Sequence, residues 1–214
     1  MTPRRSIALV TAAAHRHLAR DPVMRRLIRR HGPCGLECRR WSPYEALTRA
    51  IAHQQLNGRA AQTILTRFVA LFGNRRFPTP AEVLATHPRR LRSAGFSRAK
   101  VRAIKDIARH ALAGTVPTRR AAAHLDDEAI IERLLPIRGV GRWTVEMLLI
   151  FTLGRPDVWP VDDFGIRKGF ATIHGLVEPP TPKALDPLGE IYRPYRSSAA
   201  WYCWQAVDTV LPQA

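Results

Sequence analysis

A short Gly-Val-Gly segment between two apolar stretches is the feature that most constrains the fold of this chain. The sequence Leu-Leu-Pro-Ile-Arg precedes it at residues 134–138, and Arg-Trp-Thr-Val follows at residues 142–145. The apolar residues on both sides recur at helical spacing, so the sequence predicts a helix, a tight hairpin and a second helix. Because Gly139 and Gly141 allow backbone angles closed to other residues, N–H groups of the turn and of the next helix can point outward together. Such donors at a helix N-terminus suit a phosphate, although a plain helix turn is the alternative.

The charge of the chain indicates a polyanionic partner. It has 34 lysines and arginines against 17 acids, a formal net charge of +17. Nucleic acid is the commonest partner of such a chain, and a membrane surface is the rival. No apolar run approaches the ~18 residues of a membrane-spanning helix, and the Arg-rich N-terminus lacks the features of a signal peptide. We therefore expect no membrane partner and a location in the cytoplasm, associated with the bacterial nucleoid, or in the nucleus of a eukaryote.

Helix start and stop signals recur along the whole chain. Asp21-Pro22 is typical of a helix start, and Ser42 with Glu45 and Thr79 with Glu82 each fit a capping box. Further helices are predicted over residues 4–20, 60–72, 97–113, 127–135, 142–153, 163–173 and 185–191, and a final helix holds Trp201, Tyr202, Trp204 and Val207. No stretch alternates like a strand, so the sequence predicts an all-α fold of about ten helices.

Metal and disulfide chemistry is not indicated. The three cysteines, Cys34, Cys38 and Cys203, are too few for a four-cysteine metal site, and an odd number argues against a disulfide framework. The histidines are scattered or at a spacing that diverges on a helix.

Three segments together carry a family resemblance. Residues 134–145, the sequence His-Gln-Gln-Leu at residues 53–56 and the segment from Pro194 to Trp204 stand in the order typical of helix-hairpin-helix DNA glycosylases. More narrowly, the chain resembles the 3-methyladenine DNA glycosylase II branch over roughly residues 15–210. The resemblance implies a compact form without an N-terminal β domain. It also implies two helical lobes with a DNA-binding cleft between them, one at residues 42–154 with the helix-hairpin-helix at 127–154, and one at residues 1–41 and 155–214.

The acid pair Asp162-Asp163 follows the hairpin by about twenty residues. Asp163 falls where the family keeps its catalytic aspartate, and a carboxylate there can stabilise the positive charge that develops on the sugar. Either acid could instead cap the helix that begins near Phe164, and Asp162 suits that role better.

Three further positions match the base pocket of the alkylation-specific branch. The resemblance assigns Trp143, Met147 and Trp204 to it, and indole faces favour a cationic purine by about 0.5 to 2 kcal/mol. Tryptophans on apolar helices are more often core, which is the alternative. Relatives that also cut the DNA strand have a lysine in place of Trp143, so the chain should be monofunctional. Met147 replaces a tyrosine of some relatives, which leaves the substrate range open.

The resemblance also assigns the contacts to DNA. Gln55 or Leu56 would be the wedge that fills the gap left by a flipped nucleotide, although Leu56 could simply be buried between two helices. No cofactor is required, but the carbonyls of Leu135, Ile137 and Val140 could hold Na⁺ or K⁺ against a DNA phosphate. The residues expected to hold the DNA backbone are Gly139, Val140, Gly141, Arg142 and Thr144.

The sequence therefore predicts a monomeric, monofunctional DNA glycosylase of base excision repair. Its expected substrates are 3-methyladenine and 7-methylguanine flipped out of duplex DNA. Two alternatives stay open: a non-catalytic helix-hairpin-helix module that only binds DNA, and a glycosylase for another lesion such as ethenoadenine or a deaminated base.

Overall fold

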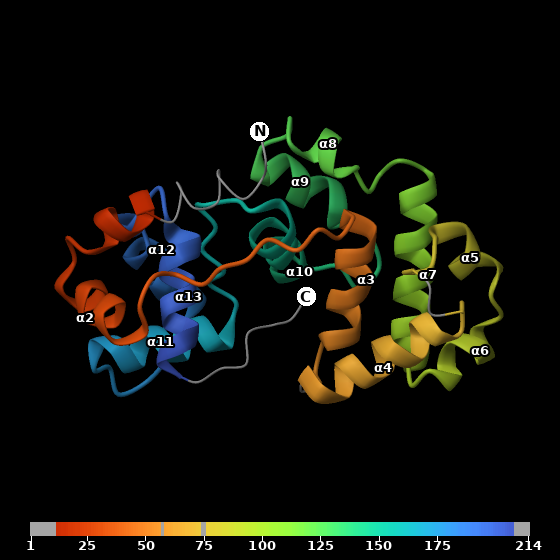
Figure 1. Ribbon diagram of the computed structural model, residues 1–214, viewed down its shortest axis with the longest axis horizontal. Coiled ribbons are helices and arrows are strands. Elements are labelled where there is room, and N and C mark those ends of the chain that lie inside the picture. Colours follow the sequence, from red (N-terminus) through yellow and green to blue (C-terminus); the bar gives the residue numbers. More distant parts are fainter. Residues whose placement is uncertain (1–11, 57, 74–75, 208–214) are drawn as a thin grey trace. The chain divides into compact units, whose positions relative to one another are not determined.

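The computed structural model describes residues 12–56, 58–73 and 76–207. These residues form two compact units, which we call unit 1 (residues 12–38 and 154–207) and unit 2 (residues 39–153). Helices and connecting turns build both units, and the described residues contain no strand (Figure 1). The prediction of an all-α fold is confirmed. No helix within the described ranges is long and apolar enough to cross a membrane.

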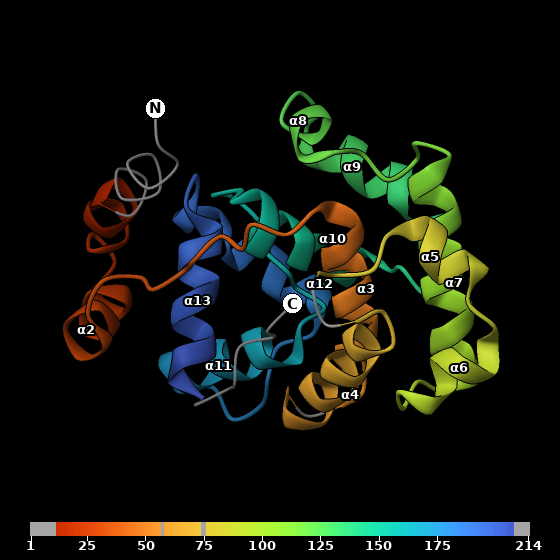
Figure 2. The same ribbon diagram turned by 45° about the vertical axis from the view of Figure 1, so that its right-hand side comes forward.

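Unit 2 is built around two long helices, α3 (Pro43–His53) and α7 (Arg98–Leu112), which pack against each other. Short helices α5 (Pro80–Ala85) and α6 (Pro88–Ser93) lie beside α7 in both views (Figures 1 and 2). The other helices of the unit are α4 (Gly58–Ala70), α8 (Arg119–Ala122), α9 (Asp127–Leu134) and α10 (Arg142–Leu148), and a π-helical turn (Leu149–Leu153) continues α10.

Unit 1 is centred on the crossing of α11 (Phe164–His174) and α13 (Arg196–Ala206). A Cβ placed on Gly169 would lie 2.0 Å from the carbonyl oxygen of Cys203, so the two helices approach closely because residue 169 has no side chain. The unit also contains α2 (Pro22–His31), α12 (Pro182–Leu188) and a 3₁₀ turn (Glu190–Tyr192). A helix is predicted over residues 4–20, and residues 12–18 are helical. Residues 4–11 of this prediction lie outside the described residues.

The predicted caps explain where most helices begin. Asp21 accepts a hydrogen bond from the Met24 N–H at 2.8 Å, and Thr79 with Glu82 forms the complete capping box. At Ser42 only half of the predicted box is present. The Ser42 hydroxyl accepts from the Glu45 N–H, but the Glu45 carboxylate instead accepts from Arg49, which lies one turn further along α3.

Candidate functional site

The Gly-Val-Gly segment forms a tight hairpin between α9 and α10. The Val140 N–H donates to the Ile137 carbonyl at 3.0 Å, and the buried side chains of these two residues anchor the turn. Gly139 has φ +79°, and a Cβ there would lie 3.0 Å from the Cβ of Ala103 on α7. Only Gly139 uses the conformational freedom that the sequence offers at both glycines, because Gly141 caps α10 with an extended φ of −99° and has open space around it. Gly139 is required by conformation, while Gly141 leaves the helix N-terminus open to a ligand.

Two side chains from distant parts of unit 2 fix the hairpin backbone. The Gln54 amide donates to the Gly139 carbonyl at 3.0 Å and to the Thr144 hydroxyl at 3.3 Å. The Asp106 carboxylate accepts from the Arg138 N–H at 2.9 Å. Gln54 lies in the His-Gln-Gln-Leu segment that carried the resemblance, yet sequence reasoning gave it no role, and nothing in the sequence marked Asp106. The predicted DNA contact Thr144 is 2 % exposed and accepts this bond from Gln54.

Arg142, another predicted DNA contact, is held by two carboxylates. Its guanidinium donates to both oxygens of Glu128 at 2.8 Å and lies 3.3 Å from Glu146. These neighbours raise the pKa of Arg142, chiefly through the hydrogen bonds to Glu128. The charge of Arg142 is therefore shared between the protein's own acids and any phosphate that approaches.

The turn between α3 and α4 presents both predicted wedge residues to solvent. Gln55 has φ +57°, a left-handed conformation that is uncommon for a residue other than glycine. Leu56 is 41 % exposed, so the alternative that it is buried between two helices is wrong. The structure brings a strained backbone and an exposed apolar side chain to one turn.

Asp163 is buried at the N-terminus of α11. Its Oδ1 atom accepts hydrogen bonds from the Ile166 N–H at 2.9 Å and from the indole N–H of Trp204 at 3.0 Å. The expectation that Asp162 is the better cap is wrong: Asp162 is exposed, and Asp163 caps the helix. The N-terminus of α11 and the indole of Trp204 thus hold the carboxylate in one orientation. A capping role and a chemical role are compatible in one residue.

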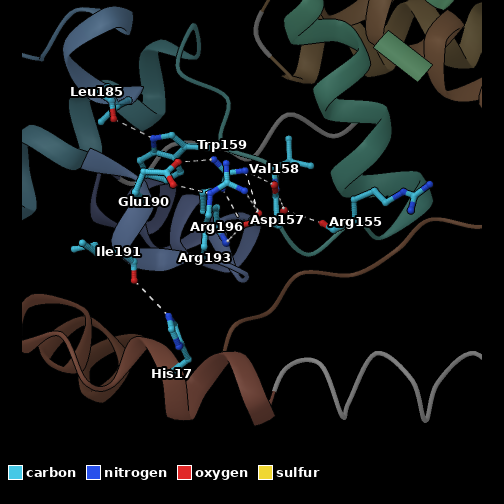
Figure 3. A network of polar contacts seen from close by, with 11 residues as sticks. His17, Arg155, Asp157, Val158, Trp159, Leu185, Glu190, Ile191, Arg193 and Arg196 are labelled. Carbon is cyan, nitrogen blue, oxygen red and sulfur yellow. Dashed lines mark hydrogen bonds and ion pairs between the residues drawn. The ribbon is translucent and has the colours of Figure 1, made fainter. Parts of the chain in front are cut away.

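The segment that leads to Asp163 is tied to α13. Arg196 donates to both carboxylate oxygens of Asp157, at 2.8 and 3.1 Å, and Arg193 donates to Asp157 at 3.0 Å (Figure 3). The Ser197 hydroxyl donates to the Arg155 carbonyl and accepts from the Val158 N–H. This network binds the 155–159 segment to the helix that carries Trp204. Its residues were missed by sequence reasoning, although Arg196 and Ser197 lie within the segment that matched the family.

The three predicted pocket residues differ in exposure. Trp204 is fully buried and donates to Asp163, and Met147 is also fully buried. Trp143 is half-buried in the first turn of α10. Their part in base recognition stays a prediction. Within the described residues no three His, Cys, Asp or Glu side chains are placed to hold a metal ion.

A helix-hairpin-helix and a buried carboxylate at a helix start, in described residues that form helices and no strands, are features of a base-excising DNA repair protein. Residues 48–194 match the HhH-GPD superfamily of base excision DNA repair proteins. The match covers more than half of the chain, and the chain belongs to this family.

Within this family, the chain is similar to proteins named as glycosylases of alkylated bases. The chain is 46% identical over 163 residues to DNA-3-methyladenine glycosylase 1 of Schizosaccharomyces pombe, covering 76% of this chain and 72% of that protein. It is 36% identical to an alkylbase DNA glycosidase-like protein of the same organism, covering 90% of this chain and 92% of the relative. A solved structure of a Schizosaccharomyces pombe 3-methyladenine DNA glycosylase with abasic DNA is similar at a TM-score of 0.84 and 40% identity, over 94% and 99% of the two chains. The predicted family and fold are confirmed.

Proposed function

We propose that this protein is a DNA glycosylase of base excision repair that hydrolyses the N-glycosidic bond of alkylated purines, 3-methyladenine and 7-methylguanine, in duplex DNA. The observation that carries the proposal is the buried Asp163 carboxylate, oriented by Trp204 and by the start of α11. It lies in a chain that is 46% identical to a DNA-3-methyladenine glycosylase.

In the proposed reaction, the bond between C1′ of the sugar and the base nitrogen breaks, and its electron pair leaves with the base. An alkylated purine is already cationic, so it departs without a dedicated general acid. Positive charge develops on the sugar, and Asp163 stabilises it electrostatically. Water then adds to C1′ and loses a proton, which leaves an abasic site. Because both donors to Asp163 approach Oδ1, the carboxylate has a fixed orientation during this step.

Strand cleavage is not part of the proposed activity. A lyase needs an amine that forms a Schiff base with C1′, and the side chain at position 143 is an indole. Incubation of the protein with duplex DNA that contains an abasic site should give no strand breaks above the buffer control, and borohydride should trap no covalent complex. A trapped complex would contradict a monofunctional enzyme.

The DNA is proposed to be held by the hairpin, with phosphates at the N–H groups of Gly139, Gly141 and Arg142, since those of Val140 and Thr144 already donate to the Ile137 and Gly141 carbonyls. Where present, Na⁺ or K⁺ would lie at the carbonyls of Leu135, Ile137 and Val140. The Ile137 carbonyl already accepts from Val140, so an ion there would use its second lone pair. Gln55 or Leu56 would enter the stack after base flipping. Trp143, Met147 and Trp204 would select the base, and one protein chain would act on each lesion.

The test is the Asp163→Asn variant. The asparagine oxygen can still cap α11, so the fold should be retained while release of methylated bases falls by about 1000-fold. DNA affinity should stay within about threefold, because phosphate contacts dominate it. The matched control is Asp162→Asn, which changes the exposed neighbouring acid and should release bases at the wild-type rate. Wild-type release by Asp163→Asn would exclude the mechanism.

A panel of single-lesion duplexes separates the remaining alternatives. Release of ethenoadenine or a deaminated base in preference to methylated purines would reassign the substrate. Tight DNA binding without release from any lesion would identify a non-catalytic binding module.

A further inference from the structure

Unit 2 contains a strongly basic groove beside the hairpin. A cavity of about 730 Å³ is lined by Arg89 and Arg92 of α6, by α7, and by Arg138 of the hairpin. The cations that α7 contributes are Arg98, Arg102, Lys105 and Arg109. The single acid among the lining residues is Asp106. Seven cations against one carboxylate make a site of strongly positive potential.

The α7 residues form one continuous face. The four cations are spaced four, three and four residues apart, so they lie on one side of the helix, while Ala103, Ile104 and Ile107 are buried on the other side. Like charges at this spacing destabilise a helix unless an anion approaches them. A solvated charged surface is the simpler explanation, but it does not account for the cations of two other elements that line the same cavity.

The protein itself neutralises only one end of this groove. Asp106 pairs with Arg109 and accepts the Arg138 N–H, and the Lys105 ammonium donates to the Leu84 carbonyl. For Arg89, Arg92, Arg98 and Arg102, the part of the chain that the structure describes supplies no carboxylate within ion-pair distance. Four guanidinium groups are therefore available to an external anion.

The groove is continuous with the hairpin that is proposed to hold DNA. Arg138 directly precedes Gly139, and Asp106 joins α7 to the hairpin backbone. From Arg98 to Arg109, α7 extends about 16 Å, the axial length of about five base pairs. Guanidinium groups bind phosphate oxygens in a bidentate way, which suits a sugar–phosphate backbone.

We propose that this groove, which we call the α7 groove, binds the backbone of duplex DNA that flanks the hairpin contact. The proposal rests on the proposed DNA glycosylase function and adds a second, sequence-independent contact. It makes the footprint on DNA longer than the hairpin alone requires.

The test compares Arg98→Gln/Arg102→Gln with Arg26→Gln/Arg30→Gln, a pair with the same spacing and the same loss of charge on the exposed face of α2. Binding to a 24-base-pair duplex is measured by fluorescence anisotropy between 50 and 200 mM salt. The logarithm of the DNA association constant falls with the logarithm of salt concentration, and each phosphate contact makes this slope steeper by about 0.9. The Arg98→Gln/Arg102→Gln pair should therefore make the slope shallower by about 1.8. The Arg26→Gln/Arg30→Gln control pair should change the slope by much less. Equal slopes for the two pairs would overturn the proposal.

Two further measurements distinguish the possible failures. Arg98→Lys/Arg102→Lys keeps both charges and should restore the slope, which a folding defect would not. Shortening the duplex to eight base pairs should remove most of the difference in salt slope between the wild type and the Arg98→Gln/Arg102→Gln pair. If that difference in slope stays the same, the groove binds small anions only. Single-turnover base release at saturating enzyme should be unchanged in the Arg26→Gln/Arg30→Gln control pair. If the wild type itself releases no base, the proposed function fails while the slope still tests the groove.

Discussion

The two units hold their functional groups in opposite ways. In unit 2 the hairpin offers backbone groups, and nearly all of it comes from one contiguous segment, supported by Gln54 and Asp106. In unit 1 the functional group is one side chain, Asp163, and its indole partner Trp204 lies 41 residues later in the sequence. A backbone site depends on local conformation, whereas the carboxylate site depends on how closely two helices pack. The same kind of substitution should therefore have different effects in the two units.

The largest difference between the units is expected when a glycine of each unit is replaced by alanine. In Gly169→Ala the new Cβ would lie 2.0 Å from the Cys203 carbonyl, so α11 and α13 must move apart and the Trp204–Asp163 hydrogen bond must break. We expect the free energy of unfolding to fall by about 3 kcal/mol, as for severe overpacking, and base release to fall with it. Gly141→Ala is the control, since its Cβ would meet no atom within 4 Å and its φ is ordinary. A wild-type melting temperature for Gly169→Ala would show that the crossing is not tight.

The hydrogen bond from Trp204 to Asp163 should affect base release but not DNA binding. Trp204→Phe removes the N–H that donates to Asp163, and a hydrogen bond to a charged group contributes about 1.5–3 kcal/mol. We expect single-turnover base release to slow by about 10- to 100-fold, with DNA affinity unchanged. Trp159→Phe is the matched control, because its indole N–H is also buried but donates to the Leu185 carbonyl. Equal losses of release in the two variants would mean that Trp204 acts only through stability.

The opposite result is expected in unit 2. Gln54→Met keeps a side chain of similar size but cannot donate to the Gly139 carbonyl or the Thr144 hydroxyl. A neutral hydrogen bond contributes about 0.5–1.5 kcal/mol, so the Kd for DNA should rise by about 3- to 10-fold through a less ordered hairpin. The rate of release at saturating enzyme should not change. A slower rate with unchanged affinity would contradict the division of roles between the units.

Sequence reasoning succeeded where the determining interactions are local. Helix starts at Asp21, Thr79 and Ser97 follow from side chains that bond N–H groups three residues away. The partners of the site are not local: Gln54 and Gly139 are 85 residues apart, and Arg138 and Asp106 are 32 apart. No periodicity or spacing marks such pairs, because tertiary packing decides them.

The error at the acid pair has a similar cause. Asp162 and Asp163 are equally good caps by residue type, and only the backbone path after Pro160 decides which carboxylate faces the helix. The structure places Asp163 there and exposes Asp162. The resemblance to the family located the acid, but its hydrogen bonds came from the fold.

The smallest expected effect concerns a property that both units share. Burial lowers the pKa of His53 in α3, with Arg49 and Lys100 adding to the shift, and burial likewise lowers the pKa of His174 in α11. Because the unfolded chain binds protons more readily at these positions, stability is fully present above the ordinary histidine pKa of about 6.5 and is lost as pH falls. Urea unfolding at pH 7.5 and 5.5 should show this loss.

Substitution of each histidine alone shows which unit causes the loss of stability at low pH. The buried Nε2 of His53 has no hydrogen-bond partner among the described residues, so protonation there meets two nearby cations and no acceptor. The Nε2 of His174 instead lies 3.4 Å from the Tyr192 hydroxyl, and Asp21 partly opposes the lowering of its pKa. His53→Gln should therefore flatten the pH dependence more than His174→Gln does. The reverse order would mean that unit 1 is the more acid-sensitive part, and that the site of Asp163 is lost before the hairpin as pH falls.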